Sequence, residues 1–266
     1  MEKQVVLITG GAGGIGLSCA YGLKEYKIVI TDYTSETVNK AVEQLITDGI
    51  DAVGINCDIT NQESITKLVD FTKAQGNLKG VLHSAGVSGS VNNPKLVFDV
   101  DLLATYNLIE AFKPLLNKGS AMILLSSMMG HTIPANEVYD AALRNPKQDN
   151  SFSVIEAFIG NSADVMYNFA KRGVLLLAKD FAMELGKKGA RIVSISPGVI
   201  MTSMSEKALK EHPEVMEQTL KMTPMARYGL PEDIRNAVKF LVSDDAGFIT
   251  GTDILIDGGV VTQMLK

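Results

Sequence analysis

The stretch YNFAK places a tyrosine and a lysine four residues apart, at Tyr167 and Lys171. Four residues make about one helical turn, so both side chains fall on one face of a helix. A phenol is a weak acid in water, and a neighbouring ammonium makes its ionisation easier. The pair is therefore suited to proton transfer, although the face of an ordinary amphipathic helix can carry the same two residues.

A glycine-rich turn, TGGAGGIG at 9–16, stands between an apolar run and a helical segment. Glycines let a backbone turn tightly and approach a pyrophosphate, and the helix N-terminus offers free N–H groups to it. Three spacings fit this stretch (GxGxxG, GxxGxxG and TGxxxGxG), so the pattern does not choose a subfamily. The residues expected at a dinucleotide are Gly10, Gly13, Gly14, Ile15 and Gly16.

Asp32 ends the next apolar run and is followed by Tyr33. A carboxylate there can accept hydrogen bonds from the ribose hydroxyls of NAD, and it repels the 2′-phosphate of NADP. Residues 32–37 contain no Arg or Lys that would favour NADP, so we expect NAD. Asp58 and Ile59 end the third run and are expected near the adenine, with a helix cap as the alternative role of Asp58.

The elements that must position these residues are apolar runs alternating with helical segments. The predicted strands cover residues 4–10, 27–32, 51–58, 78–86, 121–127, 190–198 and 252–259. Nearly continuous apolar strands that alternate with helices form a parallel sheet covered on both faces. We predict an α/β fold, with a single Rossmann-type domain over 1–266 built on a doubly wound parallel seven-stranded sheet.

Composition narrows the function further. The net charge of −5 disfavours a nucleic-acid partner. No apolar run reaches the roughly 18 residues that span a bilayer, and the N-terminus lacks the layout of a signal peptide. Two cysteines are too few for a disulfide framework, and three scattered histidines show no metal-ligand spacing. We expect a cytoplasmic protein that uses no metal and no membrane.

Eight motifs in order make the chain resemble the classical short-chain dehydrogenases/reductases over nearly its whole length. They are TGGAGGIG, the strand-end Asp32, CDIT at 57–60, HSAG at 83–86, LLSS at 124–127, YNFAK, SPGVIMT at 196–202 and ITGTDILIDGG at 249–259. The resemblance implies that Tyr167 is the general acid/base and that Lys171 stabilises the tyrosinate and holds the nicotinamide ribose. It implies that Ser127 holds the substrate oxygen. Family alignment puts that serine directly before an MMG-like turn, which favours Ser127 over Ser126.

The resemblance also implies cofactor contacts from two later loops. One holds Ser84, Ala85 and Gly86, and the other would hold the nicotinamide carboxamide through Pro197, Gly198, Val199 and Thr202.

Two positions depart from the family pattern. Ser84 stands in place of an asparagine, which puts the contacts of that asparagine in doubt. Asp101 stands where the family has an asparagine that connects the lysine to solvent through a water. An ionised aspartate cannot donate a hydrogen bond, but it can still accept one from a water or pair with Lys171. A carboxylate near the lysine favours the charged ammonium and opposes a tyrosinate, so we expect catalysis with a shifted pH optimum. In the alternative, Asp101 only holds the helix backbone.

Ser127 and Tyr167 lie 40 residues apart, far more than in typical members of the family. The extra chain, about 134–162, has helical periodicity at 136–144 and 151–159, which predicts two short helices in an active-site flap. Its placement resembles the bacterial 3α-hydroxysteroid dehydrogenase/carbonyl reductase branch, in which the insertion covers a helix-pairing surface. This favours a homodimer over a tetramer. A surface excursion without function is the alternative.

Residues 199–228 form the second expected wall of the substrate site. Methionines gather there and beside Ser127: Met128, Met129, Met201, Met204, Met216, Met222 and Met225. Methionine suits adaptable apolar surfaces, so the pocket is expected to be apolar, with a methionine-rich core as the alternative.

We therefore expect an NAD-dependent oxidoreductase that interconverts a secondary alcohol and a ketone on a bulky hydrophobic substrate such as a hydroxysteroid or bile acid. Two other functions stay open. One is a catalytically silent NAD(H)-sensing protein, and the other, suggested by the GxxGxxG spacing, is a nucleotide-sugar epimerase or dehydratase.

Overall fold

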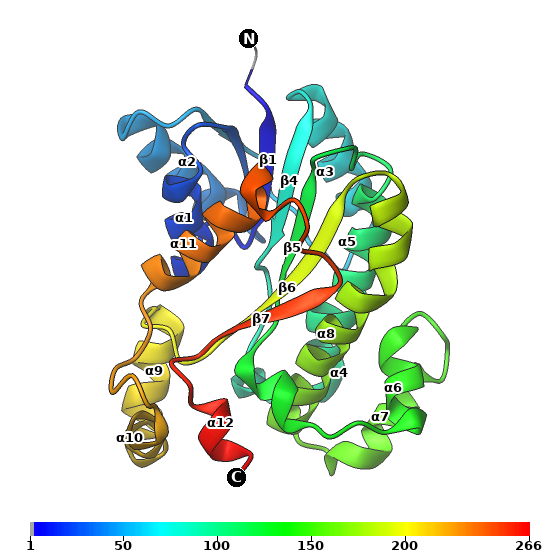
Figure 1. Ribbon diagram of the computed structural model, residues 1–266, viewed down its shortest axis with the longest axis vertical. Coiled ribbons are helices and arrows are strands. Elements are labelled where there is room, and N and C mark those ends of the chain that lie inside the picture. Colours follow the sequence, from blue (N-terminus) through cyan, green and yellow to red (C-terminus); the bar gives the residue numbers. More distant parts are fainter. Residues whose placement is uncertain (1–2) are drawn as a thin grey trace.

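The computed structural model describes residues 3–266, apart from the side chains of residues 204, 207 and 208, so that of Met204 lies outside the described part. A seven-stranded, all-parallel sheet in the order β3-β2-β1-β4-β5-β6-β7 forms its centre (Figure 1). The strands are β1 (Val5–Thr9), β2 (Lys27–Thr31), β3 (Ala52–Gly54), β4 (Leu78–His83), β5 (Ala121–Leu125), β6 (Arg191–Pro197) and β7 (Thr252–Ile256). This confirms the predicted Rossmann-type α/β fold.

Three predicted strands run three or more residues past the observed ends, namely β3, β4 and β7, the last of which stops at Ile256 rather than at residue 259. Strand β3 stops at Gly54 rather than at residue 58, because the chain beyond it keeps only isolated hydrogen bonds to β2 and the residue after it: Ile55 N–H to the carbonyl of Ile30 at 3.2 Å and Cys57 N–H to that of Asp32 at 2.9 Å. Strand β4 ends at His83 rather than at residue 86, since the next residues turn toward the glycine-rich loop.

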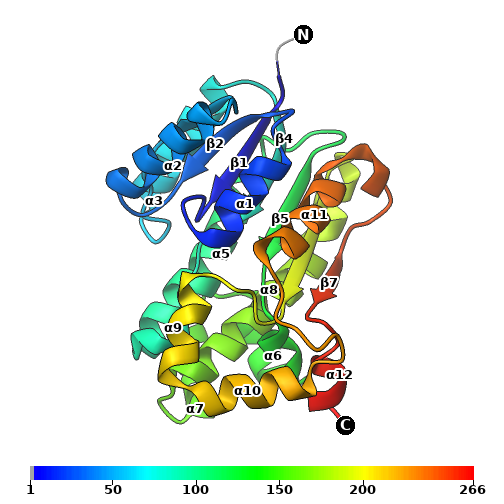
Figure 2. The ribbon, with the colours of Figure 1, turned by 90° about the vertical axis from the view of Figure 1, so that its left-hand side faces the viewer.

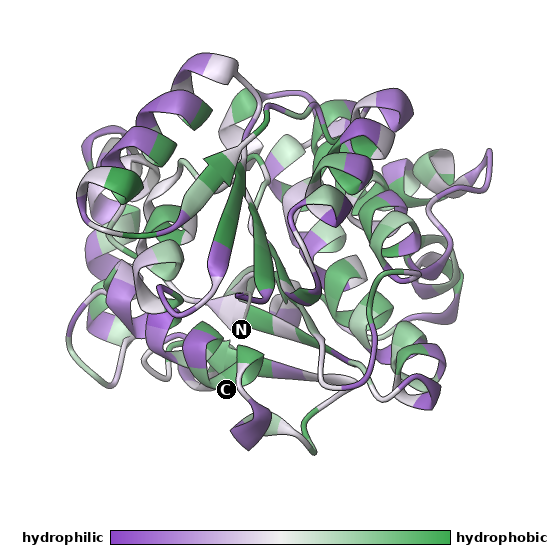
Figure 3. Ribbon diagram, turned by 90° about the horizontal axis from the view of Figure 1, so that it is seen from above, coloured by the Kyte–Doolittle hydropathy of each residue, from purple (hydrophilic) through white to green (hydrophobic). Residues whose placement is uncertain are grey.

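Helices cover both faces of the sheet (Figures 1 and 2). One face carries α1 (Gly14–Gly22), α2 (Ser35–Thr47) and α11 (Pro231–Val242), and the other carries α3 (Gln62–Ala74), α4 (Pro94–Phe98), α5 (Ala104–Phe112) and α8 (Ala163–Lys187). Alternate residues of β1 enter the two cores: Val5 and Leu7 face one, Val6 and Ile8 the other. Apolar strands thus lie between helices whose outer faces are polar (Figure 3).

The remaining elements gather mainly at the carboxyl ends of the strands (Figure 2). They include α6 (Glu137–Arg144), α7 (Ser151–Ile159), α9 (Ser203–Glu211), α10 (Pro213–Met222), α12 (Val261–Met264), the 3-10 turns η1 (Gly89–Val91) and η3 (Met128–Thr132), and a π-helical turn η2 (Asp99–Leu103); the 3-10 turn η4 (Asp244–Ala246) follows α11. Within residues 3–266, no helix is long and apolar enough to cross a bilayer.

The two helices predicted in the insertion are confirmed as α6 and α7. Both pack against α8, where the ring of Tyr139 meets that of Phe169 edge-on at 4.9 Å. Phe152 of α7 meets Phe98 of α4 in the same way at 5.5 Å. The guanidinium of Arg172, on α8, donates to both carboxylate oxygens of Asp140 at 2.6 Å. The insertion therefore forms a helical layer on α4 and α8, and its role as an active-site flap stays a prediction.

Candidate functional site

Helix α8 carries Tyr167 and Lys171. It begins at Ser162, whose side-chain oxygen caps it by accepting from the N–H of Val165 at 3.3 Å. The side chain of Lys171 is buried, and its Nζ lies 5.3 Å from the centre of the Tyr167 ring. The same ammonium donates to the carbonyl of Leu125, at the end of β5, at 3.4 Å. The ammonium thus sits between the phenol and the end of a central strand.

The two serines after β5 differ in what their hydroxyls do. Ser126 donates its hydroxyl to the carbonyl of Lys171 at 2.8 Å, which ties β5 to α8. The oxygen of Ser127 accepts from the N–H of Met129 at 3.2 Å and so caps η3, which packs on α8. Because the hydroxyl hydrogen of Ser127 has no acceptor within the described part of the chain, this residue is better suited to donate to a substrate.

Asp101 lies in the π-helical turn η2 and is 1% exposed. Its Oδ1 accepts from the N–H of Val87 at 2.8 Å, and its Oδ2 lies 3.7 Å from Nζ of Lys171. A Cβ atom on Gly86 would come within 2.8 Å of Oδ1, so the loop after β4 packs directly on the carboxyl. Isolated π turns occur often at functional sites, and this one places a carboxyl beside the lysine.

A chain of hydrogen bonds links the backbone of Asp101 to Thr9, the first residue of the glycine-rich turn. Its carbonyl accepts from the hydroxyl of Thr105 at 2.8 Å, which leaves Thr105 to accept from Nε2 of His83 at 3.0 Å. Nδ1 of His83 must then accept from the hydroxyl of Thr9 at 2.7 Å. Burial, aided by the charge of Lys171, lowers the pKa of His83 to about 3. This histidine is therefore neutral.

The glycine-rich turn has the close backbone packing that its sequence predicts. Gly10 has φ of +63°, and a Cβ there would lie 2.7 Å from the backbone nitrogen of Ala85. A Cβ on Gly16 would lie 2.3 Å from the carbonyl oxygen of Gly10. Gly13 precedes α1 as its N-cap, and Gly14 and Ile15 are the first residues of that helix. The N-terminus of α1 therefore opens onto this turn, as binding a pyrophosphate requires.

Asp32 lies against the same turn. Its Oδ2 accepts from the N–H of Ala12 at 3.1 Å and its Oδ1 from that of Tyr33 at 2.8 Å. These bonds fix the carboxylate at the end of β2, and each oxygen keeps a lone pair for a ribose hydroxyl. The side chain of Tyr33 is 70% exposed.

Asp58, after β3, and Ser84, after β4, make hydrogen bonds that hold the neighbouring turns. Asp58 accepts from both the N–H and the hydroxyl of Thr60, at 2.9 and 2.6 Å, so it stabilises the turn before α3. The cap of that helix is Asn61, which accepts from the N–H of Ser64 at 2.9 Å, so the helix-cap alternative for Asp58 is wrong. Ile59 is buried in the core. The hydroxyl of Ser84 donates to the carbonyl of Thr9 at 2.6 Å. Ser84 thus joins the end of β4 to the start of the glycine-rich turn. The sequence had left open whether a serine at this position could replace the contacts of the family's asparagine.

The loop after β6 also reaches the turn. Pro197 ends the strand, and the N–H of Gly198 donates to the carbonyl of Ile256 at 2.9 Å. The carbonyl of Val199 accepts from the N–H of Gly229 at 2.9 Å. A Cβ on Gly14 would lie 2.9 Å from the methyl carbon of Thr202, so the loop closes over the start of α1.

The methionines divide into several groups. Met128, Met129 and Met222 pack in a small apolar cluster with Val199 and residues of α12. Met216 is buried in α10, Met201 is partly buried, and Met225 is 63% exposed. The cluster places apolar side chains directly beside Ser127, whereas the buried Met216 fits the core alternative.

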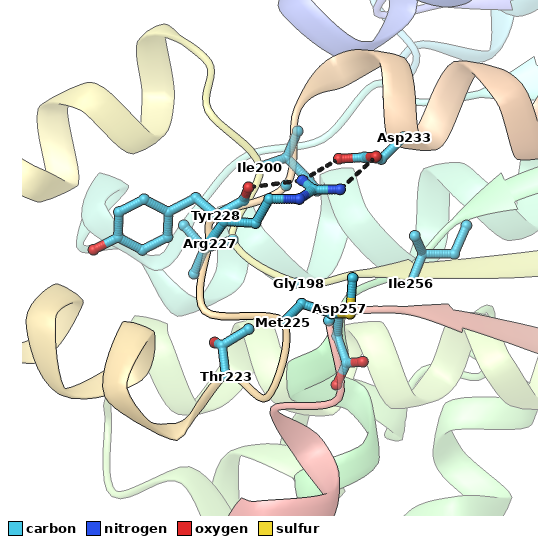
Figure 4. A pocket seen from close by; sticks show the side chains of 12 residues that line it. Gly198, Ile200, Thr223, Met225, Arg227, Tyr228, Asp233, Ile256 and Asp257 are labelled. Atoms are coloured by element: carbon cyan, nitrogen blue, oxygen red, sulfur yellow. Dashed lines mark hydrogen bonds and ion pairs between the residues drawn. The ribbon is translucent and has the colours of Figure 1, made fainter.

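A cavity of about 240 Å³ lies between the 198–200 loop and residues 223–229. Arg227, Asp233 and Asp257 line it together with apolar side chains, and Figure 4 shows the guanidinium of Arg227 directed at Asp233. Ser127, Tyr167 and Lys171 do not line this cavity. It is also more polar than the apolar pocket that the methionines predict.

Sequence reasoning missed a polar cluster next to Ser127. Nε2 of His131, in η3, lies 2.9 Å from Oδ2 of Asp253 on β7. Oδ1 of Asp253 accepts from the hydroxyls of Ser194 and Ser196 at 2.6 and 3.0 Å. The cluster ties the turn after Ser127 to β6 and β7. Only the period-two spacing of Ser194 and Ser196 on one strand face could have signalled it.

Comparisons with known proteins agree with this geometry. Residues 4–142 match the family model described as short chain dehydrogenase, and residues 151–261 match one described as Enoyl-(Acyl carrier protein) reductase. A 3-oxoacyl-(acyl-carrier-protein) reductase of Staphylococcus aureus (strain Mu50) is 30% identical, over 96% of each chain. The chain belongs to the short-chain dehydrogenase family. A short-chain dehydrogenase/reductase of Alternaria brassicicola named bsc3 is 27% identical, over 99% of this chain and 98% of the relative.

Solved structures agree with the family assignment. The crystal structure of gox2181 superposes with a TM-score of 0.81 at 25% identity, over 98% of this chain and 97% of the other. A 7α-hydroxysteroid dehydrogenase complexed with NADH and 7-oxo glycochenodeoxycholic acid shares the fold, with a TM-score of 0.78 at 24% identity over 96% of this chain and 93% of the other. This short-chain dehydrogenase is therefore an oxidoreductase of a family that uses a nicotinamide cofactor and small-molecule substrates.

Proposed function

We propose that the protein is an NAD-dependent oxidoreductase that interconverts a secondary alcohol and a ketone. The observation that carries the proposal is the position of Lys171. Its side chain is buried, and its ammonium lies 5.3 Å from the centre of the Tyr167 ring, beside the strand that leads to Ser127. In this arrangement Ser127 holds the substrate oxygen, Tyr167 exchanges a proton with it, and Lys171 stabilises the phenolate. NAD supplies the hydride chemistry when bound, while the protein orients the reactants.

The choice of NAD over NADP rests on Asp32. Its carboxylate is held against the glycine-rich turn by two backbone N–H groups, where it can accept from ribose hydroxyls and repel a 2′-phosphate. Our proposal places the cofactor between this carboxylate and the loop of Gly198, Val199 and Thr202. Replacing Asp32 with serine removes the repulsion, so the preference for NAD should fall when rates with the two cofactors are compared.

The proposed substrate is a bulky hydrophobic alcohol or ketone, such as a hydroxysteroid or bile acid. Its support is the apolar cluster around Met128, Met129 and Met222 beside Ser127. The name of one neighbouring structure, a 7α-hydroxysteroid dehydrogenase, agrees with this class. The names of curated relatives also include tropinone reductase-like 3 and 2-(S)-hydroxypropyl-CoM dehydrogenase 3, so the substrate panel must extend beyond steroids.

We further propose that residues 1–266 act as one dehydrogenase domain and that two copies form a dimer, because α6 and α7 cover α4 and part of α8. The cytoplasm is the proposed location, consistent with two free, buried cysteines. The names of the relatives favour neither a silent NAD(H) sensor nor a nucleotide-sugar epimerase.

The test is NAD⁺ reduction by the purified protein with hydroxysteroids, bile acids and simple secondary alcohols, run beside Tyr167→Phe. Turnover that the variant loses supports the reaction and the role of the tyrosine. Turnover that survives in Tyr167→Phe would refute that role, and activity with small alcohols alone would refute the substrate class.

A further inference from the structure

Asp101 is a buried carboxyl in which one of the two oxygens makes a hydrogen bond and the other makes none among the described residues. Oδ1 accepts from the N–H of Val87, whereas Oδ2 has no hydrogen-bond partner in the described part of the chain. The nearest cation to Oδ2 is Nζ of Lys171, at 3.7 Å with both side chains almost fully buried. A buried polar atom without a partner is costly, so this atom depends on the lysine charge or on a proton of its own.

The charged groups around Asp101 are few. Lys171 faces it from α8, with the Tyr167 ring on that lysine. His83 on β4, linked to it through Thr105, is neutral because its pKa is lowered to about 3. Lys95 and Asp99, on the neighbouring turns, pair with each other at 2.6 Å nearer the surface. Among the described residues, one ammonium therefore serves two groups that can become negative, the carboxyl and the phenol.

We propose that Asp101 and Tyr167 compete for the single ammonium of Lys171, so that Tyr167 keeps its proton to higher pH than it would beside an asparagine. The inference rests on the proposed function and adds which direction of the reaction, ketone reduction or alcohol oxidation, is favoured near neutral pH. Reduction of a ketone needs the neutral phenol as proton donor, and oxidation of an alcohol needs the phenolate as acceptor. A competing carboxylate therefore favours ketone reduction near neutral pH.

Two further observations agree with this coupling. Burial raises the pKa of Asp101, with the charge of Lys171 and the bond from Val87 acting against it. The carboxyl thus gives up its proton less readily than an exposed aspartate, so its ionised form depends on the charge of Lys171. The two groups are also close, because distances of 3.7 Å and 5.3 Å from Nζ place Oδ2 no more than 9.0 Å (3.7 plus 5.3) from the Tyr167 ring centre. Sites coupled in this way titrate as a pair.

The first test needs no substrate. The chain has seven tyrosines and no tryptophan, so tyrosinate formation can be followed by ultraviolet absorbance. Subtracting the titration of Tyr167→Phe from that of the parent isolates Tyr167. Asp101→Asn keeps the shape of the side chain and the acceptor for Val87 but removes the charge. It should lower the midpoint of the isolated titration by about one pH unit, the size expected for a unit charge at this range in a medium of effective dielectric constant about 20.

Asp99→Asn is the matched control, because it removes a carboxylate two residues away that is already paired with Lys95, and it should leave the midpoint unchanged. An unchanged midpoint in Asp101→Asn, or an equal shift in both variants, overturns the coupling. In turnover assays, the high-pH limb of ketone reduction should move down by the same unit in Asp101→Asn. Absence of turnover in all variants despite the shifted titration would count against the proposed reaction and leave the coupling supported.

Discussion

The ion pair between Arg172 and Asp140 offers a sharp test of how the insertion is held. It joins α8 to α6 through two bonds of 2.6 Å, and its side chains are only 13% and 15% exposed. Arg172 also donates to the carbonyl of Ile133 at 3.1 Å, where the insertion begins. The pair raises the pKa of Arg172, chiefly through the hydrogen bonds to Asp140.

Asp140→Asn should destabilise the protein by about 3 kcal/mol, because it leaves a largely buried guanidinium without a counter-charge. A chain of this size loses roughly 2–4 °C in Tm for each kcal/mol, so Tm should fall by about 6–12 °C. The control is Asp180→Asn, which removes the ion pair of Arg144 between the same two helices. That pair is 40% and 36% exposed, so its loss should cost less than about 1 kcal/mol.

Thermal and urea unfolding of the two variants beside the parent would measure the difference. The double variant Asp140→Leu with Arg172→Met should recover part of the loss, since neither charge is then buried alone. Equal effects of Asp140→Asn and Asp180→Asn would refute the reasoning, because burial would then not decide what these pairs contribute.

Two further perturbations test the network around the site. The pKa of His83 is lowered to about 3 in the folded protein, and an unfolded histidine titrates near 6.5, so the free energy of unfolding should fall as the pH drops through this range. His83→Asn should flatten that fall in a Tm series from pH 7 to pH 4, and parallel curves would contradict it. Asp253→Ala leaves His131, Ser194 and Ser196 without their shared acceptor and should cost about 2–4 kcal/mol in urea unfolding. A loss below about 1 kcal/mol would mean that the cluster contributes little.

The sequence predicted the elements that are set by local patterns. Apolar runs located the seven strands, and helical periodicity located α6 and α7 with their bounds nearly correct. The end of β3 was wrong because the alternating apolar residues Ile55 and Cys57 continue the strand pattern, whereas regular pairing with β2 stops at Gly54. The end of an edge strand depends on its pairing with the neighbouring strand, and this pairing cannot be predicted from the composition of the segment alone.

Within the candidate site, the sequence predicted residues but not their partners. The lysine pairing of Asp101 was one of two options left open, and the structure places Lys171 at 3.7 Å from it. The cluster of His131 and Asp253 joins residues 122 positions apart, and no local pattern encodes such a contact. The polar cavity near Arg227 was likewise hidden, since the methionines of the same segment suggested an apolar wall.

The position of β1 in the sheet has a consequence for how the chain folds. Strand β1 pairs with β2 on one side and with β4 on the other, and the second pairing brings Thr9 beside His83, 74 residues later. During synthesis, one edge of the fully buried strand β1 therefore stays open until β4 has emerged. Parallel pairings of this kind form slowly, and an apolar open edge can associate with other chains. Refolding yield should therefore depend on protein concentration, with losses that arise before β4 has paired with β1.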